Sequence, residues 1–234
     1  MSEFEALRID RLDLTFAERP WPFAQQNRAK IDAHFAARQQ ANPALWNGAV
    51  LMLQDHAIDS AVFSGSFIGV DYASLLTWQD WGRPEAGVTN CFAQGALRAA
   101  DGAFLLGVMG PHTANAGMVY FPGGTPDRSD IVGTKVDLEG SVWRELHEET
   151  GLTQANVTPE PGWTTVLAGS RLAHFKHLQA REAADELRAR ILNVLSQQRQ
   201  PELSDIRLVR SPADFDPMMG DYVKAFLLDV WRRR

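Results

Sequence analysis

The hydrophobic positions after residue 87 alternate between strand-like and helix-like spacing. Apolar runs on either side of Asp101-Gly102 predict a hairpin over 88–109, because an Asp-Gly turn favours antiparallel strands. Four further apolar runs predict strands at 118–121, 163–168, 172–178 and 206–209. Apolar residues at helical spacing predict helices over 138–150, 181–198 and 218–231. Strands interleaved with helices predict the α/β fold class.

The first 86 residues have a less regular pattern, but they are too apolar to form a tail. The pattern predicts a strand over 7–14, a helix over 21–40 and strands at 50–53 and 61–63. We therefore predict two parts. Residues 1–86 form an N-terminal α/β extension, which packs on a core domain of residues 87–234.

Residues 144–152, Arg-Glu-Leu-His-Glu-Glu-Thr-Gly-Leu, carry the clearest chemical signal. A helix turns about 100° per residue, so Glu145, Glu148 and Glu149 fall on one face within roughly 100°. Three carboxylates placed so closely repel one another, and a divalent cation relieves that repulsion. Gly151 then predicts the end of the helix.

These residues resemble the second half of the Nudix box, Arg-Glu-aliphatic-X-Glu-Glu-X-Gly-aliphatic. Residues 121–124, Phe-Pro-Gly-Gly, resemble the strand and glycine turn that open the box. The resemblance implies a Nudix hydrolase. Such an enzyme is an α/β/α sandwich with a mixed sheet, and it uses Mg²⁺ or Mn²⁺ to activate water against a diphosphate linked to a nucleoside or a similar group.

The resemblance and the clustering together predict the functional residues. Glu145, Glu148 and Glu149 are the expected metal ligands, and a backbone carbonyl at Gly124 is a further candidate ligand. Arg144 is expected to pair with Glu148 and to orient the carboxylates. The sequence leaves open which carboxylate, in the box or on a distant loop, accepts the proton of the attacking water, and how many metal ions bind.

The spacing inside the box differs from the family pattern, in which five residues separate the opening glycine from a glutamate and seven more precede the arginine. Counting back from Arg144 places Val136 at the glutamate position. We interpret 125–130, a polar and turn-rich run, as a six-residue insertion. Asp137 or Glu139 is then the candidate replacement for the glutamate, although Asp137 also suits the helix N-cap.

Composition narrows the possible partners. With 234 residues, 45% of them hydrophobic, the chain can bury a full core, and its net charge of -6 argues against an extended nucleic-acid partner. The single cysteine, Cys91, cannot form an internal disulfide. The sequence shows no signal-peptide pattern and no apolar run of the ~18 residues that a membrane span needs. We expect a cytoplasmic protein without a membrane partner, and a homodimer is left open.

Residues 42–48, Asn-Pro-Ala-Leu-Trp-Asn-Gly, resemble an element ahead of the box in Nudix proteins that hydrolyse nucleoside diphosphate sugars such as UDP-glucose. The other interpretation is a tight Asn-Gly turn that enters a strand. Nucleotide sugars are therefore the leading substrate class, and coenzyme A or a dinucleotide is the alternative. The absence of arginine from 104–109 argues against coenzyme A as the substrate. A non-catalytic nucleotide sensor is the rival, favoured by Val136 and opposed by the three glutamates.

Two groups of residues outside the box are candidates for contacts with the substrate. The candidates for phosphate contacts are Arg98, Arg171 and Lys176, although most such cations are solvated surface residues. The candidates for stacking on a base are Trp46, Trp78, Trp81 and Trp163, although aromatic residues lie more often in the core. The sequence does not select among them.

Overall fold

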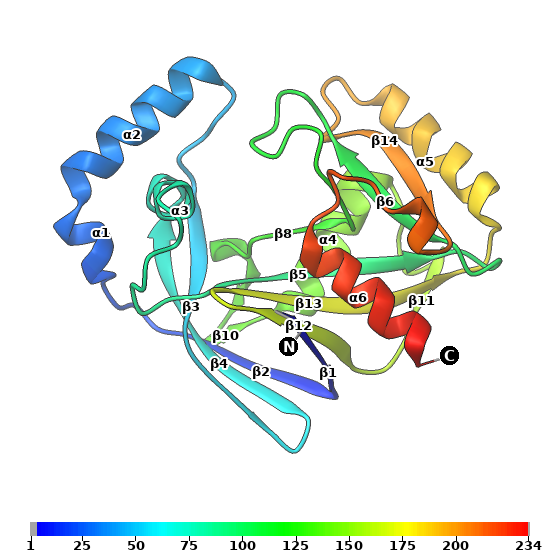
Figure 1. Cartoon of the computed structure of the whole chain (residues 1–234), viewed down its shortest axis with the longest axis horizontal. Helices are drawn as coiled ribbons and strands as arrows, with labels where there is room; N and C mark the ends of the chain where they lie inside the picture. The colour runs from blue at the N-terminus through cyan, green and yellow to red at the C-terminus, as the bar shows by residue number, and fades with distance from the viewer. Residues whose placement is uncertain (1–3, 234) are drawn as a thin grey trace.

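The computed structural model describes residues 4–233, which form two β-sheets and six α-helices (Figure 1). The nine-stranded sheet has the order β1-β12-β13-β5-β6-β14, and β7, β8 and β11 pair with β6, β5 and β13. Its strands are β1 Glu5–Ile9, β5 Asn90–Arg98, β6 Phe104–Met109, β7 Val119–Tyr120, β8 Gly123–Gly124, β11 Val157–Pro159, β12 Trp163–Ala168, β13 Arg171–Ala180 and β14 Leu203–Val209.

The second sheet has five strands in the order β3-β4-β2-β10-β9. Its strands are β2 Arg11–Phe16, β3 Ala49–Asp59, β4 Val62–Asp71, β9 Ile131–Val132 and β10 Lys135–Val136. The helices are α1 Pro22–Gln26, α2 Arg28–Ala41, α3 Tyr72–Asp80, α4 Leu138–Thr150, α5 Ala184–Gln197 and α6 Asp221–Arg232. Within residues 4–233, none of these helices has both the length and the apolar character that crossing a membrane requires.

Helices cover both faces of the nine-stranded sheet. Because successive strand residues point to opposite faces, Cys91 and Ala93 of β5 pack in the cluster that contains α4 and α5. Phe92 and Ala96 pack in the cluster that contains α6. The result is an α/β/α sandwich with a mixed sheet, which confirms the fold class predicted from the sequence.

Most predicted elements after residue 87 are present. The predicted strand 163–168 and the predicted helix 138–150 coincide with β12 and α4, and the predicted hairpin is formed by β5 and β6. Residues 118–121 form only the two-residue strand β7. These segments carry their own periodicity and their own turns, so the local pattern is sufficient to locate them.

The N-terminal predictions were less accurate. The single strand predicted over 7–14 is two strands in different sheets, because the chain turns at Asp10, whose N–H donates to Ala61 O at 2.7 Å. The helix predicted over 21–40 is divided into α1 and α2 at Asn27, which has φ -111°. Helix α3 was not predicted; six of its nine residues are buried, so it lacks the one-sided apolar pattern of a surface helix.

Strands from the two sides of the boundary predicted at residue 86 pair with each other. In the nine-stranded sheet β1 pairs with β12, and in the five-stranded sheet β10 pairs with β2. Figure 1 shows α1, α2 and α3 together beside the five-stranded sheet, on the opposite side of the molecule from α5 and β14. The division into 1–86 and 87–234 stays a prediction.

His174 of β13 gives the core a pH-sensitive element. Its ring is fully buried, its Nδ1 lies 2.7 Å from Thr165 Oγ1, and the Phe63 ring meets it edge-on at 4.7 Å. Burial, with a smaller effect from nearby His56, lowers the pKa of His174 to about 3. The unfolded imidazole binds a proton near pH 6.5, so the folded state binds fewer protons between pH 6.5 and pH 3.

We expect His174 to lower the free energy of unfolding as the pH falls from about 6.5 toward 3, by about 1.4 kcal/mol per pH unit. His174→Gln should lose this slope between pH 6.5 and 5 in urea unfolding, relative to the parent protein. The control is His147→Gln on the exposed side of α4, which should keep the slope. Parallel curves for the parent and His174→Gln would contradict the prediction.

Candidate active site

Helix α4 carries its own start and stop signals. Asp137 caps it by accepting a hydrogen bond from Gly140 N at 2.9 Å, and Gly151 ends it with φ 71°. Val142 and Leu146 are fully buried and fix the helix on the sheet. Because these contacts set both ends and the rotation of α4, its acidic residues point toward one margin of the sheet.

The glycine turn lies against the acidic face of α4. Glu149 is buried, and its Oε2 accepts a hydrogen bond from Gly123 N at 3.2 Å. A Cβ at Gly124 would lie 3.2 Å from Glu145 Oε1, so only glycine leaves that carboxylate its present place without adjustment. Glu148 is the exposed member of the three. The two halves of the predicted box are thus brought together.

The electrostatics of this region favour added positive charge. Burial raises the pKa of Glu145 to about 7, against the lowering effect of the Arg144 guanidinium. Burial raises the pKa of Glu149 well above its ordinary value, and the Glu145 carboxylate raises it further. Buried carboxylates in this situation bind a proton or a cation.

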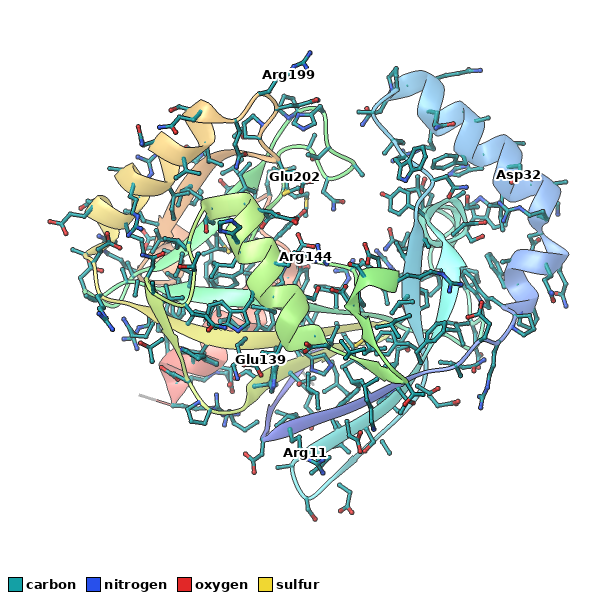
Figure 2. All side chains as sticks on the ribbon, turned by 180° about the vertical axis from the view of Figure 1, so that it is seen from behind. Arg11, Asp32, Glu139, Arg144, Arg199 and Glu202 are labelled. Atoms are coloured by element: carbon teal, nitrogen blue, oxygen red, sulfur yellow. The ribbon has the colours of Figure 1, made fainter. Side chains whose placement is uncertain are left out.

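Glu202 belongs to the same charged region and was not predicted from the sequence. Its carboxylate raises the pKa of both Glu145 and Glu149, and Figure 2 shows it toward the C-terminal half of α4. It precedes β14 in a segment without any motif, so no local signal pointed to it. Only the position of that segment beside α4 makes it a neighbour of the box.

Arg144 lies at the centre of an ion-pair group. The predicted pair with Glu148 is present, with 3.6 Å between Nη1 and Oε2. Two shorter contacts were not predicted: Nη1 donates to Glu145 Oε1 at 2.7 Å, and Nη2 donates to Asp130 Oδ1 at 3.0 Å. Arg144 therefore fixes Glu145 and is itself fixed by Asp130.

Asp130 is a buried carboxylate, 5% exposed, that three donors hold in place. Besides Arg144 Nη2, Ser141 Oγ donates to Oδ2 at 3.2 Å and Asp127 N donates to the same oxygen at 2.9 Å. Five residues separate Gly124 from Asp130, the separation that the family pattern has between its glycine and its first glutamate. Counting forward from Gly124 therefore places Asp130 at the position of the first glutamate, whereas counting back from Arg144 had placed Val136 there.

The additional residues therefore lie at Ile131–Val136 rather than at 125–130. They form a small hairpin of β9 and β10, in which Lys135 pairs with Thr15 of β2. Val136 is buried in the core and Asp137 caps α4, while Glu139 pairs with Lys176 Nζ at 3.3 Å. The insertion is between the glycine turn and the helix, as predicted, but neither Asp137 nor Glu139 replaces the missing glutamate.

We expect Asp130→Asn to lower turnover by about 10-fold or more, because Arg144 loses its buried carboxylate and no longer fixes Glu145. Activity and urea unfolding should be measured together, and the loss of turnover should exceed any loss of folded protein at assay temperature. Asp137→Asn is the matched control, since asparagine caps helices as well as aspartate does. Equal losses of activity in the two variants would rule out a special role for Asp130.

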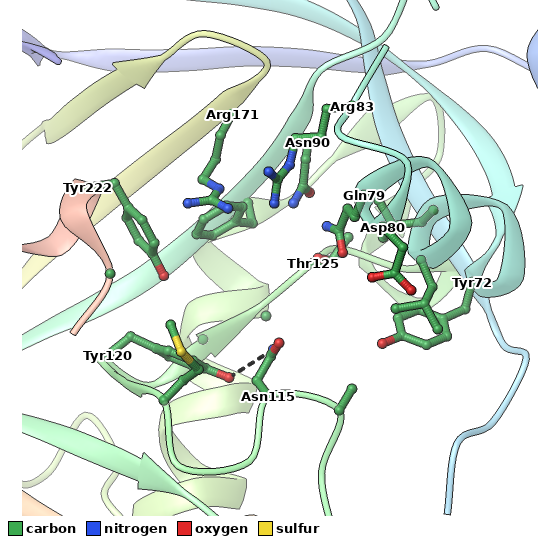
Figure 3. Close-up of a pocket in the computed structure, with 18 of the residues that line it drawn as sticks. Tyr72, Gln79, Asp80, Arg83, Asn90, Asn115, Tyr120, Thr125, Arg171 and Tyr222 are labelled. Carbon is green, nitrogen blue, oxygen red and sulfur yellow. Dashed lines mark hydrogen bonds between the residues drawn. The ribbon is translucent and has the colours of Figure 1, made fainter. Parts of the chain in front are cut away.

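A cavity of about 550 Å³ adjoins the glycine turn. Gly123, Gly124 and Thr125 form part of its wall, and Tyr72 and Asp80 of α3 lie on another side (Figure 3). The turn that contacts Glu145 and Glu149 on one side therefore borders the cavity on the other. A molecule in this cavity would reach the box while it contacts both the N-terminal segment and the nine-stranded sheet.

The carboxylates fit a divalent cation by their chemistry. They are hard oxygen donors, Glu149 is buried and Glu145 is partly buried, and Arg144 contacts Glu145 and Glu148. In residues 4–233, however, no three side chains among the His, Cys, Asp and Glu residues converge closely enough to hold a metal ion. The assignment of Glu145, Glu148, Glu149 and Gly124 as ligands stays a prediction.

Comparisons with known proteins give similarity to solved structures alone, since no family model and no curated protein matches the chain. A Nudix hydrolase from M. smegmatis, RenU, is 20% identical over 62% of this chain and 86% of that chain, with a TM-score of 0.39. The MutT protein from Methanosarcina mazei Go1 is 18% identical over 60% of this chain and 94% of that chain, with a TM-score of 0.34.

The other candidate contacts are dispersed. Of the three cations, Arg171 lines the cavity, whereas Lys176 pairs with Glu139 and Arg98 Nε donates to Gly102 O at 3.4 Å. Among the tryptophans, Trp78 and Trp163 are buried in the core, Trp46 is 81% exposed and Trp81 is 39% exposed. The aromatic rings that line the cavity are Phe92, Tyr72, Tyr120 and Tyr222.

The Asn-Pro-X-X-Trp-Asn-Gly segment positions two walls of the cavity. Asn42 Nδ2 donates to His112 O at 3.2 Å, which fixes the loop that follows β6. Asn47 Oδ1 accepts from Ala73 N at 2.8 Å, and Tyr72 N donates to Gly48 O at 2.8 Å, which fix the start of α3. The segment therefore affects the cavity indirectly, because its hydrogen bonds fix the backbone of the loop after β6 and of the start of α3.

Proposed function

We propose that this protein is a Nudix-type hydrolase that depends on a divalent metal ion and cleaves the diphosphate linkage of a nucleoside diphosphate derivative. The observation that supports this most strongly is the pairing of Glu149 with Gly123 N, which joins the two halves of the box. The Asp130–Arg144–Glu145 ion-pair group supports it further, because it orients a carboxylate that burial would otherwise leave neutral.

Glu145, Glu148 and Glu149 would hold Mg²⁺ or Mn²⁺, with the backbone carbonyl of Gly124 as an additional ligand. Such an ion, when bound, neutralises phosphate oxygens and acidifies a water molecule. The protein supplies orientation. Arg144 fixes Glu145, and Gly123 N fixes one oxygen of Glu149. The cavity beside the turn admits the substrate to this region.

We propose nucleotide sugars as the leading substrates, with coenzyme A or a dinucleotide as the alternative. The lining of the cavity includes aromatic rings and uncharged polar side chains, which suit a base and a hydroxylated group. The rival interpretation, a non-catalytic sensor, was favoured by Val136 at the position of the first glutamate. Asp130 occupies that position, so this reason no longer applies.

The test is product analysis with Mg²⁺ and with Mn²⁺ on UDP-glucose, ADP-ribose, NADH, coenzyme A, a diadenosine polyphosphate and nucleoside triphosphates. We expect hydrolysis of a diphosphate diester into two phosphate monoesters, and complete loss of turnover in EDTA. Nucleotide binding without turnover of any substrate with either metal would support the sensor instead.

A further inference from the structure

The cavity contains two guanidinium groups without a carboxylate partner of their own. Arg171 lies on β13, beside Asn90 of β5 in the sheet register, and Arg83 follows α3. Figure 3 shows both arginines and Asn90 on the same side of the cavity. Burial, with a further effect from Arg171, lowers the pKa of Arg83. No ion pair involves either arginine among residues 4–233.

The acidic residue of this cavity is already neutralised. Asp80 Oδ2 lies 2.8 Å from His34 Nε2 and 3.4 Å from Arg38 Nε, and it acts on Arg83 only at longer range. Arg38 also lines the cavity, but its charge is matched by Asp80. The net effect is a cavity with two uncompensated positive charges, both on one side.

Three buried polar atoms around the same space lack hydrogen-bond partners. They are Arg83 Nε, Asn90 Oδ1 and Gln94 Oε1. Asn90, Phe92 and Gln94 are alternate residues of β5, so their side chains point to the same face and line the cavity together. The three atoms themselves are closed off from solvent, so they give the cavity wall a polar character.

The backbone at Arg83 is also unusual. Its φ is 55°, in the left-handed region where residues with a Cβ are uncommon, and Gly82 before it has φ 82°. Trp78 O accepts a hydrogen bond from Arg83 N, and Trp78 Nε1 donates to Pro84 O at 2.8 Å. Buried Trp78 therefore holds this turn in a conformation that places the Arg83 side chain in the cavity.

We propose that this cavity binds the substrate and that Arg83 and Arg171 together bind one phosphoryl group of a diphosphate diester. The inference rests on the proposed function, since the box would then act on the same diphosphate from the other side of the glycine turn. Asn90 and Gln94 face the uncharged part of the substrate, and the Phe92 ring provides a surface for it. The N-terminal segment thus contributes half of the phosphate site through Arg83.

Charge matching defines the substrate class more narrowly. A diphosphate diester carries two negative charges, equal to the two uncompensated arginines, and the charge of a bound metal ion is offset by the box carboxylates. An additional phosphate, as in coenzyme A, would find no free cation in the cavity and would meet Asp80. The cavity therefore favours diphosphate diesters whose substituents are uncharged and rich in hydroxyl groups.

The test measures binding without turnover. Titration calorimetry in EDTA uses UDP-glucose, ADP-ribose and coenzyme A with the parent protein and with Arg83→Gln, Arg171→Gln and Arg38→Gln. We expect Kd for the better diester to rise at least 10-fold in the first two variants and less than 3-fold in the Arg38→Gln control. Coenzyme A should bind the parent protein at least 10-fold more weakly than that diester.

Folding is checked by thermal unfolding, and loss of one of two like charges should not lower Tm. If a glutamine variant does melt earlier, Arg171→Lys, which keeps the charge but loses the bidentate fork, should show an intermediate Kd in a stable protein. Unchanged affinity in both glutamine variants, equal weakening by Arg38→Gln, or no binding of any diester by the parent protein would overturn the proposal.

The two proposals fail in different ways. Metal-dependent turnover with unchanged diester affinity in the arginine variants would remove the phosphate site and leave the hydrolase intact. Arginine-dependent binding with no turnover under Mg²⁺ or Mn²⁺ would keep the phosphate site and remove the hydrolase. Binding and kinetic assays on the same protein preparations separate these results.

Discussion

Replacing Glu149 by glutamine is expected to lower hydrolysis at least about 100-fold while the protein stays folded. Glutamine has the same shape and keeps an oxygen that can accept the hydrogen bond from Gly123 N, so the box should remain assembled. What the variant loses is a negative charge at the proposed metal site. Changes in residues that only support metal ligands already cost 10- to 100-fold, so loss of a ligand should cost more.

The same change should stabilise the metal-free protein at alkaline pH. The pKa of Glu149 is raised in the folded state, so the ionised carboxylate favours unfolding once the pH passes its unfolded value of about 4.5. In EDTA, Tm of Glu149→Gln should exceed that of the parent protein at pH 8, and the difference should shrink toward pH 4. Mg²⁺ should raise Tm of the parent protein and raise that of the variant much less.

Glu139→Gln is the matched control, because Glu139 is in the first turn of the same helix and pairs with Lys176 away from the glycine turn. Its turnover per folded protein should stay within about 3-fold of the parent value, since this ion pair lies away from the glycine turn. A Glu149→Gln protein with near-normal turnover, or an equal loss in Glu139→Gln, would refute the assignment of Glu149 as a metal ligand.

Replacing Gly123 by alanine is expected to destabilise the protein by about 3 kcal/mol or more. Gly123 has φ 150°, a conformation that residues with a side chain rarely adopt. A Cβ there would also lie 2.3 Å from Ala93 O and 2.7 Å from Gln94 Cα. Both atoms belong to the backbone of β5, a central strand of the nine-stranded sheet, so neither can move without breaking strand pairing.

Gly133→Ala separates the cost of the dihedral angle from the cost of the clash. Gly133 has φ 63°, but nothing lies within 4 Å of a Cβ built on it. Its replacement should cost only about 1 kcal/mol. Urea unfolding followed by tryptophan fluorescence measures both variants, and similar losses in the two would mean that the contact of Gly123 with β5 does not matter.

Helix α4 illustrates what could be predicted from local sequence. Its caps at Asp137 and Gly151 and its apolar residues Val142 and Leu146 all lie within one short segment, so the sequence located both of its ends. Strand β12 was also located, because its apolar residues lie within one short segment. The sequence also predicted that the three glutamates lie on one face of the helix, because the helical repeat alone sets their directions.

The partner of Arg144 could not be located in this way. Counting along the chain gave the position of the first glutamate to Val136, because the hairpin Ile131–Val136 shifts the count without disturbing the fold. Asp130 contacts Arg144 across that hairpin, and Glu202 reaches the box from a segment more than fifty residues later. Such contacts depend on how the loops fold back, which local propensity does not encode.

The sequence by itself determined the fold class, helix α4 and the carboxylates on it, because periodicity and capping act between residues close together in the chain. Only the tertiary structure decided which side chains meet those carboxylates and which line the cavity. Arg83 and Arg171 are neighbours because the end of α3 and the start of β13 lie beside each other, although 88 positions separate them in the chain. Burial and charge at the site arise from that long-range packing.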